Sequence, residues 1–278
     1  MGAPSTPWRL IRPTEIAELR VTATSTPTAF IESPRTRVHV SFSVRPDRPP
    51  RIFDRRYWAR LWVIFAAVYV TAMVPLQGMG GDAWLADALY AWQGNEWALR
   101  HHWLTGGWIH GGGRRLVTAI FVGLALLTIF AWRRPGFAAR RRAMLVLLGS
   151  VLASVAVVAS IKYSLPMDCP WSLSAYGGEL PHIGLFETRP AGLPPNGCFP
   201  AAHASSGFAW VALYFFFALV RPAWRHAGLA FGLGLGTVFA ASQELRGAHF
   251  LSHDLTSLMI CWTLALAAHL SFNRPPNA

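Results

Sequence analysis

Residues 242–254 read Ser-Gln-Glu-Leu-Arg-Gly-Ala-His-Phe-Leu-Ser-His-Asp and lie where two apolar runs, at about 227–245 and 254–271, meet. Each run is long enough to cross roughly 30 Å of hydrocarbon as a helix that rises about 1.5 Å per residue. Ionisable side chains beside a bilayer are costly, so a cluster of them indicates a functional site. The stretch therefore predicts two membrane helices joined by a functional loop.

Composition favours a membrane protein over a soluble domain. The chain has 278 residues, of which 53% are hydrophobic, and 13 are tryptophan. Its formal net charge is +12, and the basic residues lie beside apolar runs rather than on aromatic-interleaved faces. This placement favours contact with membrane lipids and predicts no nucleic-acid partner.

Further apolar runs occur at about 58–77, 115–132, 143–161 and 203–220. With the first two they predict an all-α fold, a polytopic bundle of six transmembrane helices over residues 57–273. Residues 1–56 are rich in Pro, Ser, Thr and Arg without apolar periodicity, and we expect a disordered basic tail there. Residues 274–278 form a short C-terminal tail.

Arginines indicate how the bundle is oriented. They cluster at 51–60, 133–142 and 221–225, which fall on one side of a six-span topology. Cytoplasmic loops carry the excess of positive charge, so both termini are predicted to be cytoplasmic and loops 78–113, 162–202 and 246–253 to lie outside. Arg114 and Arg115 fall on the outer side and weaken this prediction.

The first outer loop is rich in tryptophan, which suits a short helix at the membrane interface. It also contains His101, His102 and His110, but no carboxylate or cysteine stands at ligand spacing beside them. We therefore expect a structural role for these histidines, and no metal site.

Three residues at the outer ends of helices are candidates for chemistry. Lys162 is the single lysine in a chain with 24 arginines. This bias favours a position that requires a compact ammonium group in contact with an anion. The alternative is a lysine that snorkels from the end of a helix. His203 follows a turn and begins a helix, where free amides favour anions. Small residues beside it could also serve ordinary helix packing. His249 belongs to the opening stretch.

Together these stretches resemble the type 2 phosphatidic-acid phosphatase superfamily. Its signature is Lys, six residues, Arg-Pro; then Pro-Ser-Gly-His; then Ser-Arg, five residues, His, three residues, Asp. The corresponding residues here are Lys162 with Cys169-Pro170, then Pro200-Ala201-Ala202-His203, then Ser242-Gln243 with His249 and His253. The resemblance covers about residues 58–271.

The resemblance implies that His249 attacks phosphorus and forms a phosphohistidine, that His203 protonates the leaving oxygen, and that Lys162 stabilises the phosphoryl oxygens. It implies no cofactor. The expected function is a metal-independent phosphatase or phosphotransferase for a lipid-linked phosphate at the periplasmic face of a bacterial cytoplasmic membrane. Candidate substrates are lipid A, undecaprenyl pyrophosphate, and phosphatidic or phosphatidylglycerol phosphates.

Several positions depart from the signature. Cys169 cannot imitate the bidentate clamp of an arginine, and Gln243 brings hydrogen-bond donors without charge. Arg246 lies three residues before His249, so on a helix the two would share a face, and we expect Arg246 to supply the missing cation. The expected phosphate-binding set is Lys162, Arg246, Gln243, Ala202 and His203.

His253 occupies the slot of the aspartate that orients the nucleophile. We expect His253 or Asp254 to orient His249, with Glu244 as an alternative. A His249–His253 metal pair, one helical turn apart, is a further alternative.

Two of the three cysteines, Cys169 and Cys198, fall in the loop between the third and fourth runs. A disulfide there is permitted in a periplasm, and two free thiols are the alternative. Cys261 falls in the last run and is expected to pack in the core.

Two other functions fit the altered signature. One is a non-catalytic membrane protein that binds an anionic lipid, and the other is a metal-dependent membrane hydrolase. The sequence predicts no particular oligomeric state.

Overall fold

The computed structural model describes residues 20–23, 29–33, 36–40, 54–184, 187–193 and 196–272. The chain divides into two compact units, Met1–Pro50 and Arg51–Ala278.

The N-terminal unit contains a three-stranded antiparallel sheet in the order β1 (Arg20–Ala23), β2 (Ala29–Ser33) and β3 (Thr36–Val40). Arg20 lies opposite Glu32, and Ser33 lies opposite Thr36. The sequence analysis predicts no sheet here, because strands of four or five residues are too short to show a clear alternating apolar pattern. The remainder of the predicted N-terminal tail and residues 273–278 lie outside the described residues.

The second unit is helical in the residues described, as the sequence predicts. Its α-helices are α1 (Arg55–Met73), α2 (Gly81–Trp92), α3 (Gly113–Ala131), α4 (Ala138–Ser164), α5 (Ala202–Phe208), α6 (Ala212–Val220), α7 (Arg225–Leu245) and α8 (Leu251–Phe272). Two π-helical segments, η3 (Val74–Gly78) and η4 (Trp103–Gly112), extend α1 and precede α3. Short 3-10 turns are η5 (Pro135–Phe137), η6 (Pro170–Ser172), η7 (Ser174–Tyr176), η8 (Ala209–Val211) and η9 (Pro222–Trp224).

Five helical segments among the described residues are long and apolar enough to cross a membrane. They are Arg55–Gly78, Trp103–Ala131, Arg140–Ser164, Ala202–Val220 and Leu251–Ser271. α7, which covers the remaining predicted span, is 21 residues long, but its glycines and its polar C-terminal end lower its hydropathy. Large apolar side chains are exposed on α1, α3 and α4, among them Ile64, Phe130 and Leu152. Exposed apolar surfaces of this kind are typical of contact with lipid, and the prediction of a multi-pass membrane protein is confirmed.

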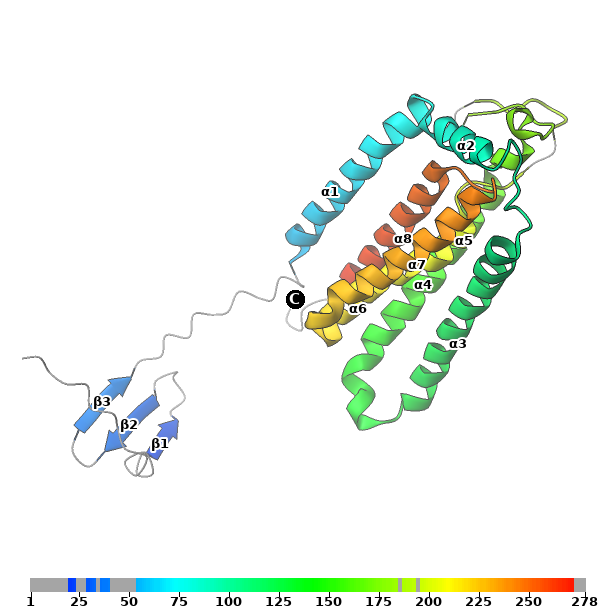
Figure 1. Ribbon diagram of the computed structural model, residues 1–278. Helices are drawn as coiled ribbons and strands as arrows, with labels where there is room; N and C mark the ends of the chain where they lie inside the picture. The colour runs from blue at the N-terminus through cyan, green and yellow to red at the C-terminus, as the bar shows by residue number, and fades with distance from the viewer. Residues whose placement is uncertain are drawn as a thin grey trace, which may run out of the picture. The chain divides into compact units, whose positions relative to one another are not determined.

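Successive long helices run in opposite directions, so that their connections alternate between two ends of the bundle (Figure 1). The start of α1 and the end of α8 lie at one end, together with the turns from α3 to α4 and from α6 to α7 (Figure 1). The opposite end of the bundle carries α2, the segment between α4 and α5, and the link from α7 to α8 (Figure 1). The cytoplasmic placement of the termini stays a prediction. We call the end of the bundle that carries α2 and the link from α7 to α8 the site end.

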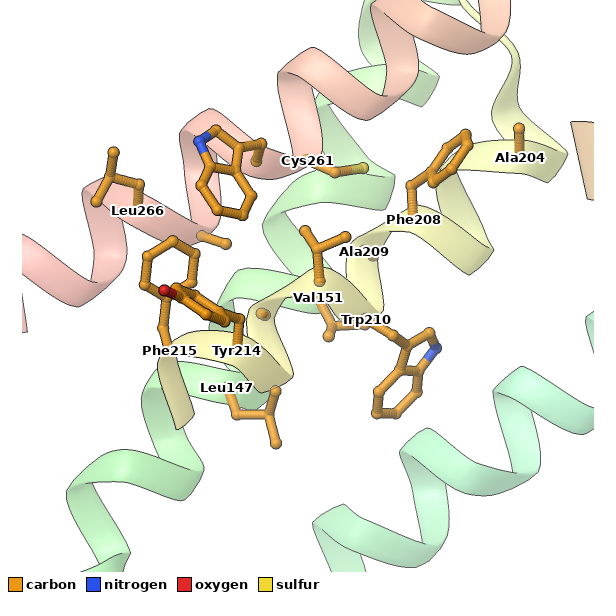
Figure 2. Packing of buried hydrophobic residues seen from close by; sticks show 14 of the residues in the cluster. Leu147, Val151, Ala204, Phe208, Ala209, Trp210, Tyr214, Phe215, Cys261 and Leu266 are labelled. Carbon is orange, nitrogen blue, oxygen red and sulfur yellow. The ribbon is translucent and has the colours of Figure 1, made fainter. Parts of the chain in front are cut away.

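The centre of the bundle is formed by α4, α5, α6, α7 and α8, which pack on one another. Leu147 and Val151 of α4 face Phe208, Tyr214 and Phe215 from the α5–α6 segment, and Cys261 and Leu266 approach from α8 (Figure 2). Cys261 is fully buried, as expected.

Glycines let α7 approach the α5–α6 segment at backbone contact. A Cβ atom on Gly232 would lie 2.6 Å from the carbonyl carbon of Trp210, and one on Gly207 would lie 2.7 Å from the Cα atom of Gly236. Gly228, Gly232 and Gly236 recur every four residues and therefore form one stripe along α7. Small residues of this kind replace hydrophobic burial as the basis of helix association in a bilayer.

The glycine stripe generates a stability prediction. Gly232→Ala should lower the thermal unfolding midpoint in detergent, because the added methyl group meets backbone atoms that cannot rotate away. Overpacking of this kind costs about 1–3 kcal/mol. Gly234→Ala is the matched control, since the same helix offers open space at that position. Equal midpoints for the two variants would contradict the contact.

Candidate active site

A cavity of about 630 Å³ opens among α3, α4, α5 and the link between α7 and α8. Lys162 from the last turn of α4, His203 from the first turn of α5, and His249 from the link all line it. The three residues that the sequence singles out are therefore brought to one place. Ala202, Gln243 and Arg246, the other predicted phosphate-binding residues, line the same cavity.

The cavity has a polar end and an apolar end. Its charged and histidine side chains come from the site end of the bundle, whereas Phe121, Val151 and Leu152 line it deeper along α3 and α4. Lys162 and Val151 are eleven residues apart on α4, which corresponds to about 16 Å along the helix. The cavity thus has a cationic part at the site end of the bundle and an apolar part between α3 and α4.

His203 is held between two aromatic groups. Its ring stacks on Phe239 of α7 with centroids 4.3 Å apart, and the ring of His110 meets it edge-on at 4.6 Å. The segment around it packs tightly, since Ala204 and Ser205 are fully buried. The imidazole of His203 is consequently fixed in place while it still reaches the cavity.

The segment after Lys162 is joined to the turn before His203 by a disulfide between Cys169 and Cys198, whose Cα atoms are 5.3 Å apart. The amide of Cys198 also donates a hydrogen bond of 3.0 Å to the carbonyl of Met167. At Gly197 a Cβ atom would lie 3.0 Å from the carbonyl oxygen of Lys162. The turn therefore presses on the end of α4 and keeps Lys162 near His203.

His249 lies on a short link outside any helix. The amide of Trp171 donates to the carbonyl of Gly247 at 2.8 Å, and the amide of Ala248 donates to the carbonyl of Gln243 at 2.9 Å. Gly247 adopts a left-handed backbone conformation with φ of 68° and lies against the ring of Trp97. Burial lowers the pKa of His249 well below 6.5, and nearby His253 and Lys162 lower it further. The imidazole is therefore neutral and able to act as a nucleophile.

The helix after this link is anchored by a residue that the sequence analysis did not identify. Asp82 of α2 accepts hydrogen bonds of 3.0 Å from the amide of Ser252 and from the side chain of Gln77. The first amides of a helix lack partners within the helix, so Asp82 caps α8 from outside. Burial raises the pKa of this carboxyl group, while its hydrogen bonds oppose the rise.

The two residues predicted to orient His249 lie in different surroundings. The ring of His253 is fully buried and lies 5.8 Å from that of His249, centroid to centroid. Both rings lie against the backbone of Cys198. Asp254 points instead to Glu244 and does not line the cavity. Of the pair, His253 is the one beside the imidazole of His249.

Arg246 reaches the cavity by a route that differs from the predicted one. α7 ends at Leu245 and α8 begins at Leu251, so Arg246 and His249 do not share a helical face, and that part of the prediction is wrong. The guanidinium of Arg246 donates to the carbonyl of Arg100 at 2.8 Å and to the side chain of Gln243 at 3.1 Å. The two hydrogen bonds aim it into the cavity.

Two further lining residues were not predicted as part of the site. His110 and Arg114, one helical turn apart at the junction of η4 and α3, both line the cavity. The sequence analysis predicts a structural role for His110 and uses Arg114 only to judge how the bundle is oriented in the membrane. Their i,i+4 spacing could have suggested a shared face, but no sequence feature pointed this face toward the signature residues.

No group of three or more His, Cys, Asp or Glu side chains is arranged to hold a metal ion within the residues that the structure describes. His102, for which a structural role was expected, accepts a hydrogen bond of 3.3 Å from the amide of Leu104 at the start of η4.

No curated protein matches the chain. The crystal structure of a transmembrane PAP2 type phosphatidylglycerolphosphate phosphatase from Bacillus subtilis is similar with a TM-score of 0.47 and 14% identity, over 76% of this chain and 93% of that one. Residues 143–276, which include Lys162, His203 and His249, match the model of the PAP2 superfamily. This part of the membrane unit is therefore similar to the PAP2 superfamily.

Proposed function

We propose that this protein is a phosphatase, or a phosphotransferase, that acts on a lipid-linked phosphate through a phosphohistidine at the outer face of a bacterial cytoplasmic membrane. The match of residues 143–276 to the PAP2 superfamily supports a lipid phosphatase. The observation that carries the finer proposal is the convergence of Lys162, His203 and His249 on one cavity, although they come from three separate segments.

The proposed reaction has two displacements. In the first, the lone pair of an imidazole nitrogen of His249 forms a bond to phosphorus while the bond from phosphorus to the lipid oxygen breaks. His203 gives its proton to that oxygen, and the negative charge of the bound phosphate favours the protonated ring that this step requires. In the second, water attacks phosphorus, His203 takes a proton from it, and the bond from phosphorus to His249 breaks to release inorganic phosphate. An alcohol in place of water would give phosphotransfer.

The cations of the cavity favour the transition state. Phosphoryl transfer spreads charge over the three equatorial oxygens, so catalysis depends chiefly on positioning and electrostatic stabilisation. Lys162 and Arg246 both line the pocket. The apolar part of the cavity suits the hydrocarbon tail of a lipid substrate, which supports a lipid over a soluble phosphate ester.

The nucleophile assignment has a direct test. His249→Ala should abolish phosphate release by the purified protein from phosphatidic acid, phosphatidylglycerol phosphate, undecaprenyl pyrophosphate and lipid A, because no bond to phosphorus can form. Acid-labile phosphate labelling should be lost with it. His226→Ala is the control, since His226 is remote from the cavity. Undiminished turnover in His249→Ala would refute the assignment.

The same assay separates the other two functions. Neither label nor turnover with any of the four lipids would indicate a non-catalytic lipid-binding protein. Activity that disappears after chelation and returns with a divalent cation would indicate a metal-dependent hydrolase.

The lowered pKa of His249 predicts the acidic limb of the pH profile. The nucleophile must be neutral, and a pKa below 6.5 means that it loses its proton at a lower pH than an ordinary histidine. The kcat/KM should therefore stay on its plateau as the pH falls through 6.5 and decline only well below it. Two substrates with different phosphate pKa values identify the enzyme limb, which does not move between them. An enzyme limb at or above about 6.5 would contradict the burial argument.

Arg246 gives a further prediction. Arg246→Gln should reduce kcat/KM at least about tenfold, which corresponds to roughly 1.4 kcal/mol in the transition state, because a cation that faces the phosphoryl oxygens is lost. Arg225→Gln, at the opposite end of α7, is the control. A fully active Arg246→Gln protein would show that the arginine serves the fold alone.

A further inference from the structure

The cationic end of the cavity contains a third full positive charge that the PAP2 signature does not supply. Arg114, Lys162 and Arg246 line the cavity, and its described lining includes no carboxylate. Lys162 and Arg246 belong to the signature stretches or lie beside them, whereas Arg114 comes from α3, outside the matched residues 143–276. The signature therefore does not account for the presence of Arg114 in the cavity.

Arg114 has its donors free. Among the described residues, no group accepts a hydrogen bond from its guanidinium, while Arg246 uses Nε on the carbonyl of Arg100 and Nη1 on Gln243. A guanidinium presents a planar fork that binds two phosphate oxygens at once. Arg114 can offer this whole fork to a phosphate, and Arg246 can offer only part of its own.

Arg114 also lies within electrostatic range of His203, the proposed acid. It interacts electrostatically with the rings of His110 and His203, and the ring of His110 lies 4.6 Å from that of His203. His110 and Arg114 are four residues apart and therefore share a helical face. Arg115, the next residue, is exposed like Arg114 but does not line the cavity. The two neighbouring arginines thus point to different surroundings.

The start of α3 is held against the rest of the site. A Cβ atom on Gly113 would lie 2.6 Å from the ring of Phe239, the same ring that stacks on His203. Ser242 of α7 donates a hydrogen bond of 3.2 Å to the carbonyl of Thr105 in η4. These two contacts fix the backbone from which Arg114 extends.

The signature lacks a guanidinium where one is expected. Its first arginine is replaced by Cys169, which is bonded to Cys198 and lines the cavity on the side of Lys162. We propose that Arg114 binds the phosphoryl group of the substrate and replaces, from α3, the guanidinium that the signature lost at Cys169. This inference rests on the proposed phosphatase function.

The test compares Arg114→Gln with Arg115→Gln, which removes the same charge from the neighbouring position. Arg114→Gln should lower kcat/KM by about a hundredfold, the effect of removing one preorganised donor from a transition-state site. Arg115→Gln should stay within about twofold of the parent protein. Arg114→Lys should recover part of the activity, since it restores the charge without the fork.

A second measurement does not depend on turnover. Inorganic phosphate should raise the thermal unfolding midpoint of the parent protein and of Arg115→Gln, because it binds the folded state, and it should have much less effect on Arg114→Gln. The midpoints without phosphate should agree among the three proteins, which shows that the substitution leaves the fold intact.

The outcomes separate the two proposals. If His249→Ala is inactive and Arg114→Gln matches Arg115→Gln in both measurements, the role of Arg114 is refuted and the proposed function stands. If no lipid is hydrolysed and phosphate stabilises none of the proteins, both proposals are overturned. If phosphate stabilises Arg115→Gln but not Arg114→Gln while no lipid is hydrolysed, Arg114 is an anion-binding residue and the phosphatase function fails.

Discussion

The site depends on the backbone contact between α7 and the α5–α6 segment. In a bilayer no hydrophobic effect drives helices together, so close packing of small residues takes its place. Gly207, Gly232 and Gly236 provide this packing. Phe239 follows three residues after Gly236 and is thereby placed under the ring of His203. Since Gly113 admits α3 to the same ring, one contact between helices aligns both sides of the cavity.

The loops at the site end complete the arrangement. The disulfide joins the segment after α4 to the turn before α5, and the hydrogen bond from Trp171 to Gly247 joins it to the link that carries His249. Asp82 holds the first turn of α8. A crosslink between residues 29 positions apart restricts the unfolded chain more than the folded one. Cys169 therefore exchanges an anion-binding side chain for rigidity in the loop.

Much of the membrane unit could be predicted because its signals are local. Apolar runs of about 20 residues predict the long helices directly, and the motif spacing predicts that Lys162, His203 and His249 belong together. The position of Arg114 depends on how α3 packs against Phe239, and one sequence contains no signal for such packing. The prediction that Arg246 and His249 share a helical face is wrong because α7 ends at Leu245 and Gly247 has a positive φ. Asp254 is close to His249 in the chain, but the turn of α8 directs it to Glu244 instead.

The surroundings of His249 determine whether the proposed reaction depends more on a basic nucleophile or on cations that stabilise the phosphoryl oxygens. An aspartate beside the imidazole would raise its basicity, whereas burial next to His253 and Lys162 lowers the pKa and weakens the nucleophile. A loose transition state forms little bond to the nucleophile, so a less basic imidazole costs little in rate. Negative charge on the phosphoryl oxygens is large in that state. Positive side chains line the cavity, and among the described lining residues no carboxylate offsets their charge. In the proposed reaction, replacing the aspartate with His253 is therefore tolerable, because the cations of the cavity stabilise the transition state.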